Sequence, residues 1–78
     1  MGDRMSQSQK VLNHLRKHRK GITSMQAFWK YRITRLSDRI FKLRHRGYHI
    51  LTIMEDNKFV VGKHARYVLV KEPEETFV

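Results

Sequence analysis

Gly47 divides the chain into two parts that have different residue patterns. Before it, apolar residues recur three or four positions apart, which is the spacing of one face of a helix. After it, residues 48–53 and 65–70 are rich in β-branched and aromatic side chains, which favour strands. Glycine is also a common residue just past the end of a helix. The pattern therefore predicts an α+β fold in which three helices precede a two-stranded β-hairpin.

The first two predicted helices each have a residue that can cap the start. The first begins at Ser6 or Ser8 and runs to about Arg19. The second follows Thr23, which forms a capping box with Gln26 and precedes a short helix that ends near residue 31 or 32. We expect the aromatic side chains of the second helix to lie in the core or to shield its edge. The apolar stripes are Val11, Leu12 and Leu15 in the first helix, and Met25, Phe28 and Trp29 in the second.

The third predicted helix starts at Thr34, whose hydroxyl is suited to an N-terminal cap, and ends at Gly47. Leu36, Ile40 and Leu43 fall within about 60° of one another on a helical wheel, so they form a narrow core stripe. The order of helix, short helix, helix and hairpin is that of a helix-turn-helix followed by a wing. We expect the hairpin to be the wing.

The length of the chain, 78 residues, allows one small domain, which we place at residues 6–70. Residues 71–78 are expected to form a flexible acidic tail that begins near Pro73. A core of this size leaves little room for an enclosed catalytic pocket, so we do not expect an enzyme. The absence of cysteine excludes disulfides and thiolate metal sites. His14 and His18 are four residues apart but have no third ligand nearby, so we expect neither a metal nor a cofactor.

The charge of the chain is unevenly distributed. The formal net charge is +10, and residues 4–54 contain thirteen of the 17 Lys and Arg but a single acid, Asp38. Such a concentration of positive charge favours a polyanionic partner such as nucleic acid. A solvated face, or a surface for acidic proteins, is the alternative. No apolar run is long enough to span a membrane.

The outer face of the third helix has the residue types that read DNA. In a helix-turn-helix this helix lies in the major groove, where Arg and Lys donate to guanine acceptors and to phosphates. Asp38 accepts from a cytosine amino group or pairs with a neighbouring cation, and we favour the pairing. The candidate DNA-binding residues of the recognition helix are Thr34, Arg35, Asp38, Arg39, Lys42 and Arg46, with His45 on the same arc.

The connection between the two strands carries a second group of candidates. Cations at a wing tip lie over a phosphate backbone or enter a narrow minor groove. A loop that only keeps the protein soluble is the alternative. Between the turns, residues 59–61 are apolar and are expected to extend one strand. The candidate wing residues are Lys58, Lys63, His64 and Arg66.

The segments 21–24, 33–40 and 43–50 resemble a family of small winged helix-turn-helix proteins that phages and prophages of bacteria encode. Their shared pattern is an Ile-Thr-Arg-Leu run, an Arg-Ile pair, and a Leu-Arg followed by Arg-Gly-Tyr. The resemblance covers roughly residues 8–70 and implies DNA binding. It implies that Thr34, Arg35 and Arg39 belong to the recognition helix. It also implies a core that contains Ile33, Leu36, Ile40, Leu43, Tyr48 and Ile50.

One position departs from this family pattern. Where such proteins usually have Gly in the turn between the two helices, this chain has Arg32. A side chain in a left-handed turn costs about 1 kcal/mol. Either the turn is built differently or Arg32 accepts the strain, and its side chain then adds a phosphate contact.

Two functions are consistent with these features. The first is a sequence-dependent, double-stranded DNA-binding protein of phage type in the cytoplasm of a bacterial host, associated with the nucleoid. It acts as a transcriptional regulator or as an excisionase-like architectural factor, and as a homodimer or on tandem sites, because one copy reads only about three or four base pairs. The second is a protein-interaction module that binds an acidic host protein. Exposure of Trp29 and Phe59 in one patch favours the second function, and a continuous positive surface favours the first.

Overall fold

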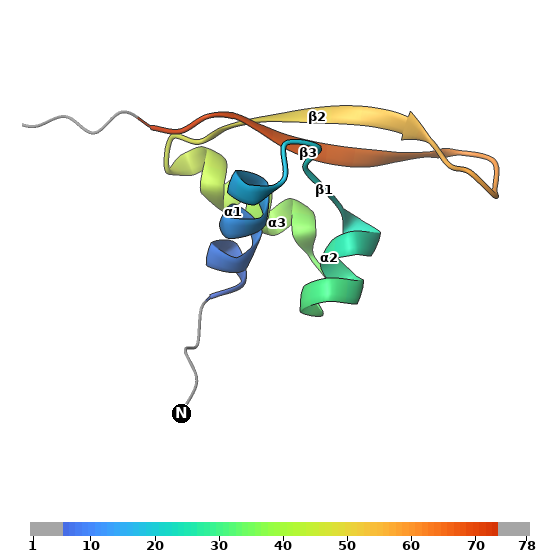
Figure 1. Ribbon diagram of the computed structural model, residues 1–78, viewed down its shortest axis with the longest axis horizontal. Helices are drawn as coiled ribbons and strands as arrows, with labels where there is room; N and C mark the ends of the chain where they lie inside the picture. Colours follow the sequence, from blue (N-terminus) through green and yellow to red (C-terminus); the bar gives the residue numbers. More distant parts are fainter. Residues whose placement is uncertain (1–5, 74–78) are drawn as a thin grey trace, which may run out of the picture.

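The computed structural model describes residues 6–73 and shows helices packed against one face of an antiparallel sheet (Figure 1). The sheet has three strands in the order β1-β3-β2, so β3 is central. The α+β winged arrangement is therefore confirmed, with one additional strand, β1. The elements are α1 (Gln7–Lys17), β1 (Ile22–Thr23), α2 (Ser24–Tyr31), α3 (Leu36–His45), β2 (His49–Asp56) and β3 (Lys63–Lys71).

The caps predicted for α1 and α2 are present. The Ser6 hydroxyl accepts a hydrogen bond from the backbone N–H of Gln9 at 3.1 Å. In α2, the Thr23 hydroxyl accepts from the Gln26 N–H at 3.2 Å, and the Gln26 side chain accepts from the Thr23 N–H at 3.1 Å. Each cap satisfies N–H groups that have no partner inside the helix. α1 ends at Lys17, two residues earlier than expected.

The predicted start of α3 at Thr34 is wrong. The helix begins at Leu36, and the residue before it, Arg35, has a non-helical backbone (φ −123°, ψ 66°) and makes no side-chain cap. Ile33 and Leu36 are both buried, so residues 34 and 35 cross between two core positions instead of starting the helix. At the other end the helix stops at His45. Thr34, Arg35 and Arg46 thus flank α3 and are not part of it.

The core lies between the helices and the sheet, and it contains the predicted stripes of α1 and α3. The predicted stripe of α2 is wrong. Its buried residue is Ala27, while Trp29 is 67% exposed and Met25 is 69% exposed. Ala27 and Tyr31 are four residues apart and form the inner face of α2, which places Met25 and Trp29 on the opposite face. The core residues are Val11, Leu12, Leu15, Ile22, Ala27, Ile33, Leu36, Ile40, Leu43 and Ile50.

A buried histidine joins α1, α2 and the turn between α1 and β1. His14 Nε2 lies 3.2 Å from the carbonyl of Gly21, and Nδ1 lies 2.7 Å from the Tyr31 hydroxyl. Because the carbonyl can only accept, Nε2 donates, and Nδ1 of the neutral ring accepts from Tyr31. Burial lowers the pKa of His14, and the nearby His18 lowers it further, which favours the neutral ring.

The hairpin differs from its prediction at both ends. Residues 59–61 do not extend a strand but form the exposed turn between β2 and β3. At the other end β3 continues to Lys71, one residue into the expected tail. The next residue, Glu72, accepts a charge-assisted hydrogen bond from Arg16 of α1 at 2.6 Å. Residues 74–78 of the expected tail lie outside the described residues.

Arg32, which follows α2, has a left-handed backbone (φ 59°, ψ 32°), so this residue accepts the strain. We expect Arg32→Gly to raise the free energy of unfolding by about 1 kcal/mol, because glycine has no Cβ to clash in this conformation. Urea denaturation at constant pH measures the change. Arg32→Ala is the matched control, since it removes the same charge and keeps the strain. Equal stability of the Gly and Ala variants would contradict the prediction.

Candidate nucleic-acid interface

The outer face of α3 is solvent-exposed along its length and is polar except for Phe41. It lies opposite the buried stripe of Leu36, Ile40 and Leu43, as the wheel predicts. Asp38 and Lys42 are exposed on the helix itself, whereas Arg35 and Arg46 are exposed at its two ends. The face therefore offers cations at its start, its middle and its end. The exposed residues of α3 and its caps are Arg35, Ser37, Asp38, Phe41, Lys42, Arg44, His45 and Arg46.

Asp38 makes the expected pair with Arg35, at a distance of 4.0 Å between Oδ2 and Nη1. Both side chains are exposed, so water screens the pair and its contribution to stability is at most about 1 kcal/mol. Arg35 can leave such a weak pair for a phosphate or a base at little cost. The arrangement keeps Arg35 available and placed at the start of α3.

Arg39 lies at the edge of the outer face and is half-buried. Within residues 6–73, its Nε is the buried side-chain nitrogen or oxygen without a hydrogen-bond partner. A half-buried arginine has already lost part of its rotamer freedom, so it loses less on binding a ligand. Its planar guanidinium suits the two acceptors of a guanine or the oxygens of a phosphate. Arg39 is therefore the least exposed of the candidate residues at α3.

Two residues of α3 were absent from the sequence-based set. Phe41 is 61% exposed and packs edge-on against the ring of His45, with centroids 4.4 Å apart. Phe41 lies on the outer arc of the same helical wheel, so its position on the wheel is enough to identify it. An aromatic ring at this position can contact a thymine methyl group. Arg44 donates to the carbonyl of Ile50 at 2.6 and 3.1 Å and to the Thr52 hydroxyl at 3.0 Å. It therefore ties α3 to β2.

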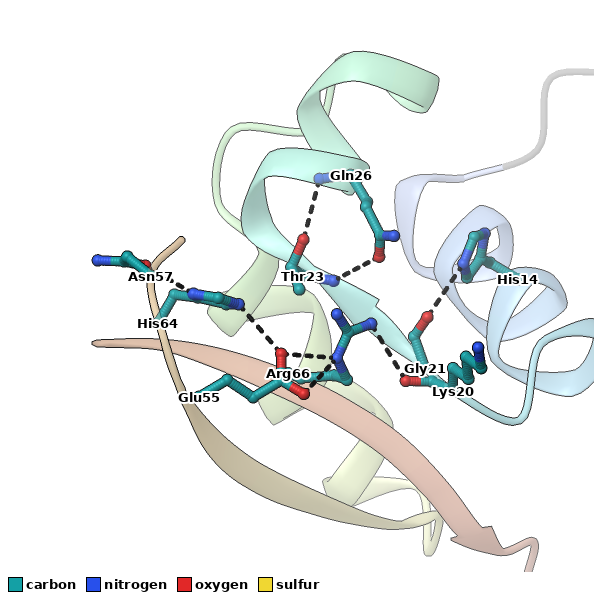
Figure 2. Close-up of polar contacts among 9 residues, drawn as sticks. All are labelled: His14, Lys20, Gly21, Thr23, Gln26, Glu55, Asn57, His64 and Arg66. Atoms are coloured by element: carbon teal, nitrogen blue, oxygen red, sulfur yellow. Dashed lines mark hydrogen bonds and ion pairs between the residues drawn. The ribbon is translucent and has the colours of Figure 1, made fainter. Parts of the chain in front are cut away.

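Three of the four predicted wing residues contact acidic side chains of the wing itself, and Figure 2 shows two of them, His64 and Arg66, beside Glu55. Arg66 donates to both carboxylate oxygens of Glu55 at 2.9 Å and to the carbonyl of Lys20 at 3.3 Å. His64 lies 3.1 Å from the same carboxylate and 2.6 Å from the side-chain oxygen of Asn57. These contacts hold the base of the wing against the turn before β1.

The remaining wing cations differ from each other. Lys63 donates to Asp56 at 2.8 Å, and both side chains are exposed. Lys58, among residues 6–73, makes no ion pair through its side chain. Arg32 is exposed between α2 and α3, with its guanidinium 5.8 Å from the ring centroid of Phe28. Within residues 6–73, Lys58 in the wing and Arg32 in the turn before α3 therefore have no acidic partner.

Neither a cluster of metal-ligating side chains nor a membrane-spanning helix occurs in the described part of the chain. No three His, Asp or Glu side chains of residues 6–73 lie close enough together to hold a metal ion. None of the described helices has the length and the apolar character that crossing a membrane requires.

The fold and the exposed basic helix define a winged helix-turn-helix domain. A family model described as a winged helix-turn-helix domain matches residues 6–72, so the chain belongs to this family. Such domains are typically DNA-binding modules without enzymatic activity, which supports DNA as a partner. Comparisons with curated proteins and with solved structures found no match.

The wing network makes stability depend on pH through Glu55. The hydrogen bond from Arg66 lowers the pKa of Glu55 below its ordinary value of 4.5. Because the folded-state pKa is lower than the unfolded one, the stabilisation is complete above pH 4.5 and is lost as the pH falls through the folded-state value. We expect the stability difference between the wild type and Glu55→Gln to shrink toward zero over this range. Thermal denaturation of both proteins from pH 7 to pH 3 measures it, and a constant difference would contradict the prediction.

Proposed function

We propose that the protein binds double-stranded DNA in a sequence-dependent manner, with α3 in the major groove. The observation that carries this proposal is the exposed polar face of α3, with cations at its start, middle and end, opposite a fully buried apolar stripe. An α-helix is about 10–12 Å in diameter and fits a groove about 12 Å wide, and the ten residues of α3 extend about 15 Å along it. The helix can therefore present side chains to several base pairs.

The residues around α3 divide between base and phosphate contacts in this proposal. Arg35 and Arg39 are one helical turn apart and read guanines, while Lys42 lies one turn further along. The two residues at the ends, Thr34 and Arg46, are placed for the phosphates on either side of the groove. Arg32 adds a phosphate contact from the turn before α3.

In the wing, Lys58 makes the direct phosphate contact in this proposal. Lys63, His64 and Arg66 hold the hairpin in position through their acidic partners, and Lys63 is the most exposed of these three. The proposal therefore assigns positioning to residues that the sequence suggested as direct contacts.

We further propose a phage-type role as a transcriptional regulator or as an excisionase-like architectural factor in the cytoplasm of a bacterial host. One copy of α3 reads only about three or four base pairs, so a homodimer or tandem binding supplies the specificity of either role.

A second candidate function is binding to an acidic host protein, and the outer face of α2 favours it. Met25 and Trp29 are exposed one turn apart, and Lys30 and Arg32 flank them. Exposed Trp and Arg are frequent anchors of protein interfaces. Trp29→Ser would weaken such a complex and leave DNA affinity unchanged, so the two functions can be separated with this variant.

The DNA-binding proposal predicts the effects of removing α3 cations. We expect Arg35→Ala and Arg39→Ala each to weaken binding to the specific site by about 1–3 kcal/mol. Lys17→Ala, on the last turn of α1, is the matched control, since it removes one exposed positive charge outside α3. Fluorescence polarisation with a labelled specific duplex measures the affinities.

The salt dependence of binding provides a separate check. The logarithm of affinity should fall with the logarithm of salt concentration, with a slope of about −0.9 for each neutralised phosphate.

Two results would contradict these predictions. A double variant, Arg35→Ala with Arg39→Ala, that still binds its own site like the wild type would refute the role of α3. Absence of binding to random duplex DNA at low salt would refute the whole DNA-binding proposal and leave binding to an acidic host protein as the candidate function.

A further inference from the structure

The tip of the wing is apolar and fully exposed. Phe59 is 95% exposed, Val60 67% and Val61 104%, and they are consecutive. Single exposed apolar residues are common on protein surfaces, but a contiguous cluster indicates a contact with another molecule. The sequence pattern predicts a strand here and, where Phe59 forms one patch with Trp29, a surface for an acidic host protein.

A two-stranded ribbon carries this tip away from the rest of the protein. β1 pairs with β3 only as far as Arg66, so beyond that point β2 and β3 pair with each other alone. Three residue pairs, from Met54–Ala65 to Asp56–Lys63, form this part, which is about 10 Å long. In Figure 1 the hairpin runs past α2 and its tip lies away from the helices.

Hydrogen bonds close the base of the exposed turn. The backbone N–H of Asn57 donates to the carbonyl of Gly62 at 3.0 Å, and the Asn57 side chain contacts His64 at 2.6 Å. Gly62 has a positive φ of 126°, which glycine adopts easily. Residues 58–61 therefore form a short loop that is closed by these contacts at the end of the ribbon.

The residues beside the tip indicate the chemistry of its partner. Lys58 precedes Phe59, and the structure gives it no acidic partner within residues 6–73. The partner must therefore combine negative charge on its outside with apolar surface within. The minor groove of DNA has this combination, because phosphates line its rims and the faces of stacked bases become accessible where a base step opens.

We propose that the wing tip inserts into the minor groove as an apolar wedge and bends the duplex. Phe59 enters between two base pairs, Val60 and Val61 pack against the sugars, and Lys58 binds a flanking phosphate. The inference rests on the DNA binding proposed above and adds an activity to it. Wedges of this kind partially unstack a base step and kink the duplex toward the major groove by about 20–90°.

The wedge also predicts a sequence preference at a position without hydrogen-bond readout. Pyrimidine–purine steps such as TA unstack at the lowest cost, so the tip should select such a step beside the site that α3 reads.

The test measures the bend separately from the affinity. Dyes at the two ends of a duplex of about 25 base pairs report the end-to-end distance by FRET at saturating protein. 2-Aminopurine in the duplex reports unstacking through a rise in fluorescence. The loop variant is Phe59→Ser with Val60→Ser and Val61→Ser. The matched control is Leu51→Ser with Val70→Ser, which removes exposed apolar side chains from the strands.

We expect the wild type and the matched control to raise FRET and 2-aminopurine fluorescence, and the loop variant to lose both signals. The loop variant should still bind DNA at high protein concentration, with affinity reduced about tenfold because the apolar contact is lost. The single variant Phe59→Leu should still bend the duplex, unlike the loop variant, since it keeps an apolar side chain at the tip. Lys58→Ala should make the slope of log affinity against log salt shallower by the contribution of about one phosphate contact, and the duplex should still bend.

Three results would overturn the wedge. A duplex that stays straight when the wild type is bound would refute it and leave the proposed DNA binding intact. Absence of duplex binding by the wild type would refute both. The third result combines two measurements. In sedimentation without DNA the wild type is a dimer and the loop variant is a monomer, and the loop variant still bends the duplex. The tip is then a contact between two copies of the chain.

Discussion

The close approach of Gly21 to β3 joins the helices to the wing. Gly21 has a φ of 82°, and a Cβ added there would lie 1.9 Å from the carbonyl oxygen of Tyr67. Only glycine fits this position. The close approach allows the next residue, Ile22, to pair with Tyr67 of β3. His14 binds the Gly21 carbonyl from α1, and Arg66 binds the neighbouring carbonyl of Lys20 from β3. The helix-turn-helix and the hairpin are therefore one body.

This construction uses several of the cations that raise the net charge to +10. Arg16, Arg44 and Arg66 bind Glu72, the carbonyl of Ile50 and Glu55 respectively, so they hold elements together. Within residues 6–73, exposed cations with a weak acidic partner or none lie at α3, in the turn before it and at the wing tip, and also at the end of α1 and in α2. Net charge therefore overstates the binding surface, and the partners of each cation are what separate structural cations from those open to a ligand.

The sequence predicts the parts of the fold that depend on local chemistry. The Thr23–Gln26 capping box, the stripe of α3 and the unusual residue at Arg32 each follow from neighbours within a few positions. β1 has two residues and pairs with a strand more than forty residues later, so no local pattern reveals it. Trp29 has the right spacing for a core stripe, but α2 packs against the core through Ala27 and Tyr31 instead. The partners of Arg66 and His64 likewise depend on strand register, which composition does not encode.

The two proposed contact surfaces would respond differently to salt. Contacts from Lys42 or Lys58 to phosphates release counterions, so their contribution to affinity falls as salt rises. Burial of Phe59 between base pairs releases no ions, and its contribution persists or increases at high salt. α3 and Lys58 would then dominate the encounter with any duplex, while the wedge would hold the protein on a site that bends easily. A domain with one modest core can in this way separate finding DNA from deforming it, because Gly21 keeps both surfaces on one rigid frame.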